Sequence, residues 1–183
     1  MNDEGMIMDN LSEKRTPFPN ICLIGMPGSG KSTIGKQLAQ KLGYVFMDAD
    51  HEFEEIIGIS PADYIESFGV PKFRQKESEL LAEFRKCTRT VISMGGGVVE
   101  IPSNRELLHA AGIAVYIKRD LEKLARGGRP VTAAKGVDRL YEERHEAYET
   151  WAELCVENNG EVSDAVESLY RMLTCGYPEV FWA

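Results

Sequence analysis

The sequence has few of the residues that stabilise secreted or metal-rich proteins. Its 183 residues include only four cysteines and three histidines. The histidines form no H-x-x-x-H pair, and no two cysteines have the C-x-x-C spacing of a zinc or redox site. The cysteines are far apart, at Cys22, Cys87, Cys155 and Cys175. This pattern disfavours a disulfide framework or a site of soft metal ligands, and it favours reduced thiols in a cytoplasmic protein.

Basic residues are outnumbered, and long apolar runs are missing from the sequence. The chain has 21 Lys and Arg against 29 Asp and Glu, a formal net charge of −8. Such a chain does not provide the broad basic surface that nucleic acids require, so an anionic ligand must be bound locally. No apolar run approaches the roughly 20 residues of a transmembrane helix. Residues 1–19 have neither the basic start nor the apolar stretch of a secretory signal. We expect a flexible leader there, and neither a nucleic acid nor a membrane as partner.

Short apolar segments alternate with amphipathic ones along the rest of the chain. This alternation predicts an α/β fold with a five-stranded parallel sheet and helices on both faces, because parallel strands need crossovers that cover the sheet. We expect it to form one domain over residues 20–183. Strands are predicted at 21–24, 45–47, 90–93, 114–117 and 155–156. Helices are predicted at 31–42, 103–111, 121–126, 138–153 and 162–173, with a mostly helical insertion at 51–86. No element is predicted after residue 173, where Phe181 and Trp182 look exposed unless they pack on the domain or on a neighbour.

A glycine-rich segment follows the first predicted strand and precedes the first predicted helix. Residues 25–32 read GMPGSGKS and match the phosphate-binding pattern G-x-x-x-x-G-K-[ST]. The glycines allow backbone N–H groups to surround phosphate oxygens at the amino end of the helix. Lys31 is expected to reach the β- and γ-phosphates, and Ser32 to bind Mg²⁺. The predicted nucleotide contacts are Gly28, Ser29, Gly30, Lys31, Ser32 and Thr33.

A phosphate loop alone does not separate kinases from GTPases, ATP-driven motors or nucleotide sensors. A GTPase would normally carry a base-reading N-K-x-D run late in the chain. The sequence instead has Asn158 and Asn159 followed by Gly160. The GTPase interpretation is therefore weakened.

Two carboxylates follow the second predicted strand. Asp48 and Asp50 are two residues apart, so an extended backbone would point both side chains the same way. We assign Asp48 to the Mg²⁺ shell and Asp50 to the hydroxyl that attacks phosphorus. The alternative is that Asp50 only caps a helix beginning near His51.

Further motifs accompany the phosphate loop in a characteristic order. They are the D-x-D pair at 48–50, FRQKE at 73–77, the glycine triplet at 95–97, Arg129-Pro130, and Arg144 followed by Tyr148. In this order and spacing, the chain from about residue 21 to 173 resembles the shikimate kinases, a family of P-loop small-molecule kinases. The resemblance implies a three-layer P-loop kinase fold, ATP and Mg²⁺ as cofactors, and a role in aromatic amino acid biosynthesis. It also implies a substrate-binding helical region at about 51–86 and a short lid at about 126–137.

The resemblance assigns roles to individual residues. Lys31, Asp50 and Arg129 would carry catalysis, with Asp50 at the acceptor hydroxyl and Arg129 at the transferring phosphoryl group. Arg126 would lie near the adenine. The acceptor would be bound by Asp50, Arg74, Gly95, Gly96, Gly97 and Arg144.

Chemistry supports the acceptor assignment, because guanidinium groups match a carboxylate in a bidentate way and glycine backbone admits a small polar ligand. The alternative is that these residues have no role in binding an acceptor. Arg74 and Arg144 would then be surface charges paired with Glu77, Glu142 or Glu143, and the glycines only a tight turn. Arg126 and Arg129 would be solvated charges on a flexible loop.

Two departures from the family pattern bear on the substrate. Only Gly127 and Gly128 separate Arg126 from Arg129, so the lid is short, and Ile65 stands where the family commonly has Phe. We expect an ATP-dependent kinase of a small hydroxy acid, with shikimate as the leading acceptor and homoserine or gluconate as alternatives. A second alternative is a non-catalytic nucleotide-binding module. We expect the protein to be a monomer.

Overall fold

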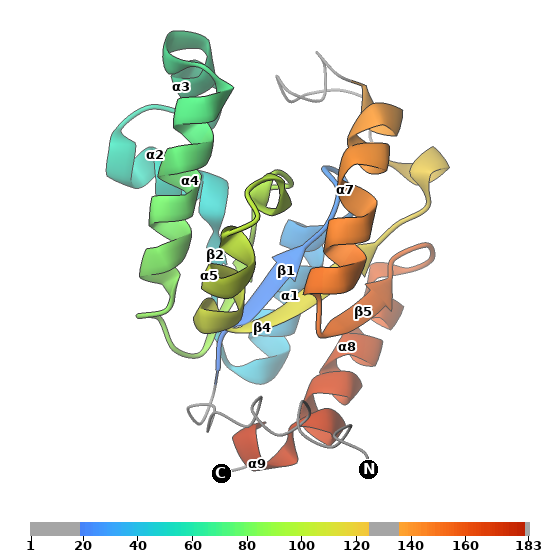
Figure 1. Cartoon of the computed structure of the whole chain (residues 1–183). Coiled ribbons are helices and arrows are strands. Elements are labelled where there is room, and N and C mark those ends of the chain that lie inside the picture. Colours follow the sequence, from blue (N-terminus) through green and yellow to red (C-terminus); the bar gives the residue numbers. More distant parts are fainter. Residues whose placement is uncertain (1–18, 125–135, 182–183) are drawn as a thin grey trace, which may run out of the picture.

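The computed structural model describes residues 19–124 and 136–181, in which five parallel strands form a central sheet (Figure 1). The strand order across the sheet is β2-β3-β1-β4-β5. The central strand β1 is buried along its whole length, which is why its sequence is a continuous apolar run. The strands are β1 (Ile21–Ile24), β2 (Val45–Asp48), β3 (Thr90–Ser93), β4 (Ile113–Lys118) and β5 (Leu154–Glu157).

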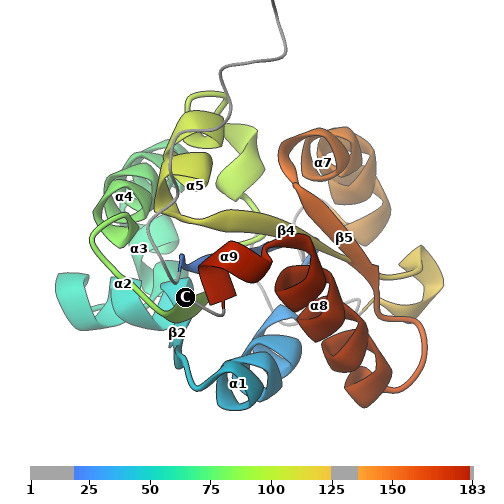
Figure 2. The ribbon, with the colours of Figure 1, turned by 90° about the horizontal axis from the view of Figure 1, so that it is seen from below.

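Helices cover both faces of the sheet. Figure 2 shows α1 and α8 on one face and α4, α5 and α7 on the other. The α-helices are α1 (Lys31–Leu42), α2 (Ala49–Ile57), α3 (Pro61–Phe68), α4 (Val70–Phe84), α5 (Asn104–Ala111), α7 (Val137–Trp151), α8 (Val162–Gly176) and α9 (Pro178–Phe181). The 3₁₀ helices are η1 (Val98–Glu100) and η2 (Leu121–Lys123). The predicted α/β fold with a five-stranded parallel sheet is thereby confirmed.

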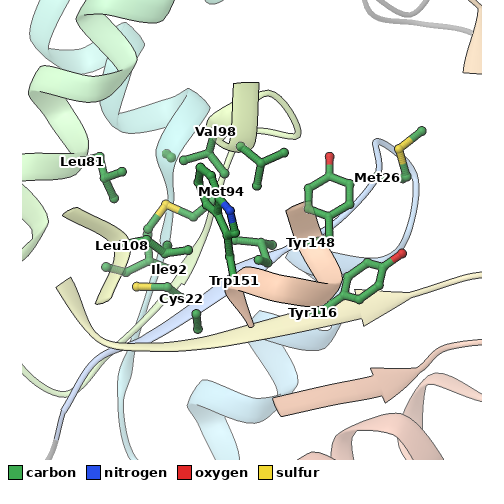
Figure 3. Packing of buried hydrophobic residues seen from close by; sticks show 14 of the residues in the cluster. Cys22, Met26, Leu81, Ile92, Met94, Val98, Leu108, Tyr116, Tyr148 and Trp151 are labelled. Carbon is green, nitrogen blue, oxygen red and sulfur yellow. The ribbon is translucent and has the colours of Figure 1, made fainter. Parts of the chain in front are cut away.

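The strands contribute side chains to two cores, one on each face. Ile21 and Leu23 of β1 belong to the core under α1 and α8, whereas Cys22 and Ile24 belong to the other core. Figure 3 shows this second core, in which Cys22 lies with residues that include Met94, Leu108, Trp151 and Tyr148. The two cores fix the sheet between its helices, and the carboxyl ends of the strands carry the loops that concern function.

Most predicted elements agree with the structure to within one to three residues. The predicted bounds of β1, β3 and α1 are those observed. The insertion at 51–86 is helical, and Ser60 caps α3 by accepting a hydrogen bond from the Asp63 amide, with Pro61 in the first turn.

Two predictions about short segments need correction. The helix expected at 121–126 is a 3₁₀ turn that ends at Lys123, because Leu124 is extended and buried in the core. An additional short helix, α9, follows α8. It buries Phe181, whose ring stacks on Tyr44 with centroids 6.2 Å apart. Phe181 therefore packs on its own domain, while Trp182 lies outside the described residues.

Candidate active site

Three glycines shape the loop between β1 and α1. Gly25, Gly28 and Gly30 have φ angles of 144°, 79° and 98°, a region that favours glycine. A Cβ atom on Gly25 would also lie only 2.6 Å from the carbonyl oxygen of Ile117 in β4. The loop leads into the amino end of α1, where Gly30 is the N-cap and no side chain caps the helix. This geometry suits a phosphate, which backbone N–H groups at a helix N-terminus bind.

The ammonium group of Lys31 lies over this loop. Lys31 is buried, and its Nζ donates hydrogen bonds of 2.9 Å to the carbonyl oxygens of both Gly25 and Met26. The side chain thus folds back along the loop and adds a positive charge to the helix N-terminus. Thr33 is exposed on the first turn of the same helix.

A residue that follows the edge strand β5 also holds the loop. Asn158, which directly follows β5, is buried and donates a 2.8 Å hydrogen bond from Nδ2 to the carbonyl oxygen of Ser29. Ser29 is itself buried, and its amide donates to the Met26 carbonyl at 3.1 Å. Ser29 therefore supports the turn with its main chain. In the sequence, Asn158 stands out only as part of a possible base-reading motif, although its place at the carboxyl end of a predicted strand points to this edge of the sheet.

Oxygen ligands meet beside the loop. Ser32 Oγ donates a 2.7 Å hydrogen bond to Asp48 Oδ2 and lies 3.1 Å from Ser93 Oγ. Asp48 and Ser93 end the paired strands β2 and β3, which brings both to this point. A hydroxyl and a carboxylate are ligands that Mg²⁺ accepts, together with phosphate oxygens and waters. In the described part of the chain no group of three or more His, Cys, Asp and Glu side chains stands ready to hold a metal. Ser32 and Asp48 offer Mg²⁺ one hydroxyl and one carboxylate oxygen beside the phosphate loop.

The backbone between Asp48 and Asp50 differs from the extended one expected. Helix α2 begins at Ala49, and Asp48 is its N-cap, with Oδ1 accepting from the Asp50 amide at 3.1 Å. The capping residue is therefore Asp48, and the idea that Asp50 caps a helix near His51 is wrong. Asp50 points toward the glycine triplet instead: a Cβ atom on Gly95 would lie 3.4 Å from its Oδ1.

The glycine triplet lies where the two sides of the site meet. A Cβ atom on Gly96 would lie 3.0 Å from Pro27 Cδ in the phosphate loop and 3.4 Å from Arg144 Nη1. A Cβ atom on Gly97 would overlap the guanidinium group of Arg74. The hydroxyl of Tyr148 donates to the Gly96 carbonyl oxygen, which anchors the turn on α7. A side chain would therefore be crowded at Gly96 and would displace the Arg74 guanidinium group at Gly97, so the turn is more than a chain reversal.

Both predicted acceptor arginines are buried and lie at this turn. Arg74 is only 7% exposed and Arg144 only 2%. Arg74 Nη1 donates to Glu77 Oε2 at 2.8 Å, and Arg74 Nε donates to Glu100 Oε2 at 2.7 Å. Arg144 Nε donates to Glu100 Oε1 at 3.0 Å, and Arg144 Nη2 donates to the same oxygen.

The surface-charge alternative for these arginines is therefore wrong. Arg74 does pair with Glu77, but inside the protein, and the carboxylate on Arg144 is that of Glu100 rather than of Glu142 or Glu143. Glu100 was not predicted from the sequence. Its signal was its position three residues after the glycine triplet, in the loop that the triplet begins.

The two carboxylates of this cluster have opposite pKa shifts. The pKa of Glu77 is raised by burial, with the charges of Asp50 and Glu100 adding to the rise, although the pairing with Arg74 acts to lower it. Burial also acts to raise the pKa of Glu100, but Arg74 and Arg144 together bring it below its ordinary value. Glu100 is therefore ionised at neutral pH and neutralises charge on both arginines.

The lid positions lie outside the described residues. This applies to Arg126 and Arg129 and to most of the expected lid at 126–137, of which Gly136 and Val137 are described at the start of α7. No helix in the described ranges has the length and apolarity to cross a membrane.

Comparison with known proteins identifies close relatives. The family model described as shikimate kinase matches residues 27–174. The shikimate kinase of Paramagnetospirillum magneticum is 38% identical over 154 residues, which cover 79% of this chain and 78% of that protein. That of Enterococcus faecalis is 37% identical over 148 residues, covering 75% of this chain and 88% of that protein. The solved structure of the shikimate kinase from Acinetobacter baumannii in complex with shikimate has a TM-score of 0.81 and 31% identity, and the match covers 87% of this chain and 94% of that one.

Proposed function

The chain belongs to the shikimate kinase family, and we propose that it transfers the γ-phosphoryl group of ATP to a hydroxyl of shikimate. The observation that carries this proposal is the position of Gly96. Its backbone lies between Pro27 of the phosphate loop and Arg144 of the arginine pair, with Asp50 beside the neighbouring Gly95. A phosphate site and a carboxylate-binding pair thus share one turn of chain, as transfer between two bound molecules requires.

The loop residues bind and neutralise the nucleotide phosphates in this proposal. Backbone N–H groups around Gly28 and Gly30 hold phosphate oxygens, and Lys31 places its charge beside the β- and γ-phosphates. Mg²⁺, when bound by Ser32 and Asp48, would neutralise negative charge on those oxygens. Arg126 at the adenine and Arg129 at the transferring phosphoryl group remain proposals from the family resemblance.

Acceptor binding uses the arginines and the glycine turn. Arg74 and Arg144 bind the carboxylate of shikimate, because buried guanidinium groups form strong charge-assisted hydrogen bonds with carboxylates. Asp50 then aligns the attacking hydroxyl and accepts its proton. Since the carboxylate and the reacting hydroxyl lie at different ends of the acceptor, binding one end orients the other.

An acceptor panel tests the proposal. Purified protein with ATP and Mg²⁺ is given shikimate, homoserine or gluconate, and ADP production is followed. We expect turnover with shikimate to exceed turnover with the other two acids by at least about tenfold, since the arginine pair and Asp50 must be engaged together. Preferred turnover of homoserine or gluconate would reassign the substrate. ADP production that no acid stimulates would favour the nucleotide-binding module.

We also propose that the protein is a cytoplasmic monomer. The four cysteines are all unpaired, which suits a reducing compartment. Light scattering of the purified protein tests the oligomeric state, with the mass of one chain, 20.5 kDa, as the expected result.

A further inference from the structure

A carboxylate of the chain already occupies the arginine pair. Glu100 accepts from Arg74 through Oε2 and from Arg144 through Oε1, so one carboxylate bridges both guanidinium groups. This is the arrangement in which a ligand carboxylate would be bound by two arginines. Glu100 therefore imitates, from within the protein, the anionic end of an acceptor.

The charges of the cluster are balanced by this contact. The two arginines carry two positive charges, and Glu77 and Glu100 carry two negative charges when ionised. A second carboxylate entering while Glu100 stays in place would bring like charges together in a poorly solvated site, which is unfavourable. An acceptor carboxylate can therefore form the full set of hydrogen bonds with Arg74 and Arg144 only when Glu100 is displaced from them.

The two glutamates differ in how firmly they are held. Glu77 is three residues from Arg74 on helix α4, its side chain is only 10% exposed, and its Oε1 packs against Gly95. The side chain of Glu100 is 22% exposed. It ends the three-residue helix η1, after which Ile101 is extended. This short segment contacts α4 on one side and α7 on the other. Glu77 is therefore the fixed partner of Arg74, and Glu100 is the displaceable partner of both arginines.

We propose that Glu100 is a built-in competitor for the acceptor site, which binding of the acceptor's carboxylate displaces. This rests on the proposed function, because it takes Arg74 and Arg144 as the carboxylate site. Glu100 lowers the affinity for every acceptor and keeps the buried arginines neutralised until an acid with a carboxylate arrives. Glu100 is a specificity-determining residue. An anion that binds weakly does not displace Glu100 from the arginines. An acceptor that binds Asp50 as well as the arginines does displace it.

The experiment compares wild type with Glu100→Ala and Glu100→Gln by calorimetric titration with shikimate and with its uncharged methyl ester. Without Glu100, the Kd for shikimate is expected to fall about tenfold. Shikimate then no longer has to replace hydrogen bonds between Glu100 and the arginines, and hydrogen bonds to charged groups contribute at least a tenfold change in affinity. The methyl ester has no carboxylate to compete with Glu100, so its Kd is expected to change little. Glu100→Gln keeps the volume of the side chain and gives the same test if Glu100→Ala does not fold.

If Glu100 has only a structural role, the Kd for shikimate should change in the opposite direction. If Glu100 only positions the arginines, its loss weakens shikimate binding, or changes the binding of acid and ester equally. Either result, or an unchanged Kd for shikimate, overturns the proposal. Glu79→Gln removes a carboxylate that pairs with Lys76 on the exposed face of α4, and it serves as the charge-matched control with wild-type affinity expected.

Turnover separates failure of this inference from failure of the proposed function. If wild type phosphorylates shikimate while the Glu100 variants bind it no more tightly, only the role of Glu100 is refuted. If neither wild type nor the variants phosphorylate shikimate, the proposed function is refuted, and the competitor role that depends on it falls as well.

Discussion

The two halves of the site are built in different ways. The proposed phosphate half is one continuous segment whose main chain would bind the phosphates, with Gly25, Gly28 and Gly30 setting its path. The proposed acceptor half is assembled from side chains of three separate elements, α4, η1 and α7. The first depends on backbone geometry and one lysine, whereas the second depends on a balance of buried charges. Substitutions should therefore separate nucleotide effects from acceptor effects.

The largest effect is expected in the phosphate half. Lys31→Ala should lower kcat at least about 100-fold, because it removes a positive charge placed where negative charge develops during transfer. ADP production measures the loss, and circular dichroism checks that the fold is retained. Lys36→Ala, an exposed lysine on the same helix, is the control. If Lys31→Ala keeps wild-type turnover, Lys31 does not act on the nucleotide phosphates, and the proposed phosphate half is contradicted.

Arg74→Ala should affect the acceptor half alone. We expect the KM for shikimate to rise about 100-fold, through the loss of charge-assisted hydrogen bonds, and the KM for ATP to change little. Leaving Glu77 and Glu100 without this partner should also lower the free energy of unfolding by about 3 kcal/mol. Steady-state kinetics and urea unfolding measure the two effects. Arg139→Ala, at an exposed arginine of α7, is the matched control. Equal losses for ATP and acid would contradict a carboxylate site separate from the nucleotide.

Gly97→Ala tests the same arginine without changing any charge. The φ of Gly97 is −90°, which alanine tolerates, but the new methyl group would overlap the guanidinium group of Arg74. Displacing that group should raise the KM for shikimate about tenfold, which corresponds to a loss of about 1.4 kcal/mol of binding energy. Gly160→Ala is the control, since a Cβ there meets no atom within 4 Å. Wild-type kinetics in Gly97→Ala would show that the position of Arg74 is unimportant.

The smallest effect concerns stability in acid. The pKa of Glu100 lies below its ordinary value of 4.5 in the folded protein. Its ionised form therefore stabilises the fold above about that pH, and this stabilisation is lost as the pH falls through the folded pKa. Glu100→Gln removes the dependence, so its unfolding free energy should approach that of wild type as the pH is lowered from 6 to 3. Urea unfolding across this range measures the difference, and a gap that stays constant would exclude a charge contribution from Glu100.

The glycine-rich loop and its flanking strand and helix could be predicted from the sequence. Glycine spacing, the lysine and the flanking strand and helix are local signals, since they act on neighbouring residues of the chain. The bounds of β1 and α1 followed from the same local pattern. The path from Asp48 to Asp50 was predicted wrongly because an aspartate at the end of a strand either continues it or caps a helix, and only the packing of α2 decides between them.

The acceptor half could be predicted only in part. Arg74 and Arg144 were proposed as acceptor residues through a family resemblance, but their burial and their shared partner could not be predicted from the sequence. Glu100 is 26 residues from Arg74 and 44 from Arg144 along the chain, and no periodicity joins positions so far apart. Whether Phe181 packs on the domain could not be decided from the sequence for a similar reason, since its contact partner Tyr44 lies far away along the chain.

The sequence by itself determined the order of strands and helices, the α/β class and the phosphate loop, because hydrophobic periodicity and glycine conformation depend on near neighbours. Tertiary structure alone decided which carboxylate the buried arginines hold. The pairing of charges depends on which side chains meet in a poorly solvated space, and here the packing of α4, η1 and α7 on one face of the sheet brings Arg74, Glu100 and Arg144 together.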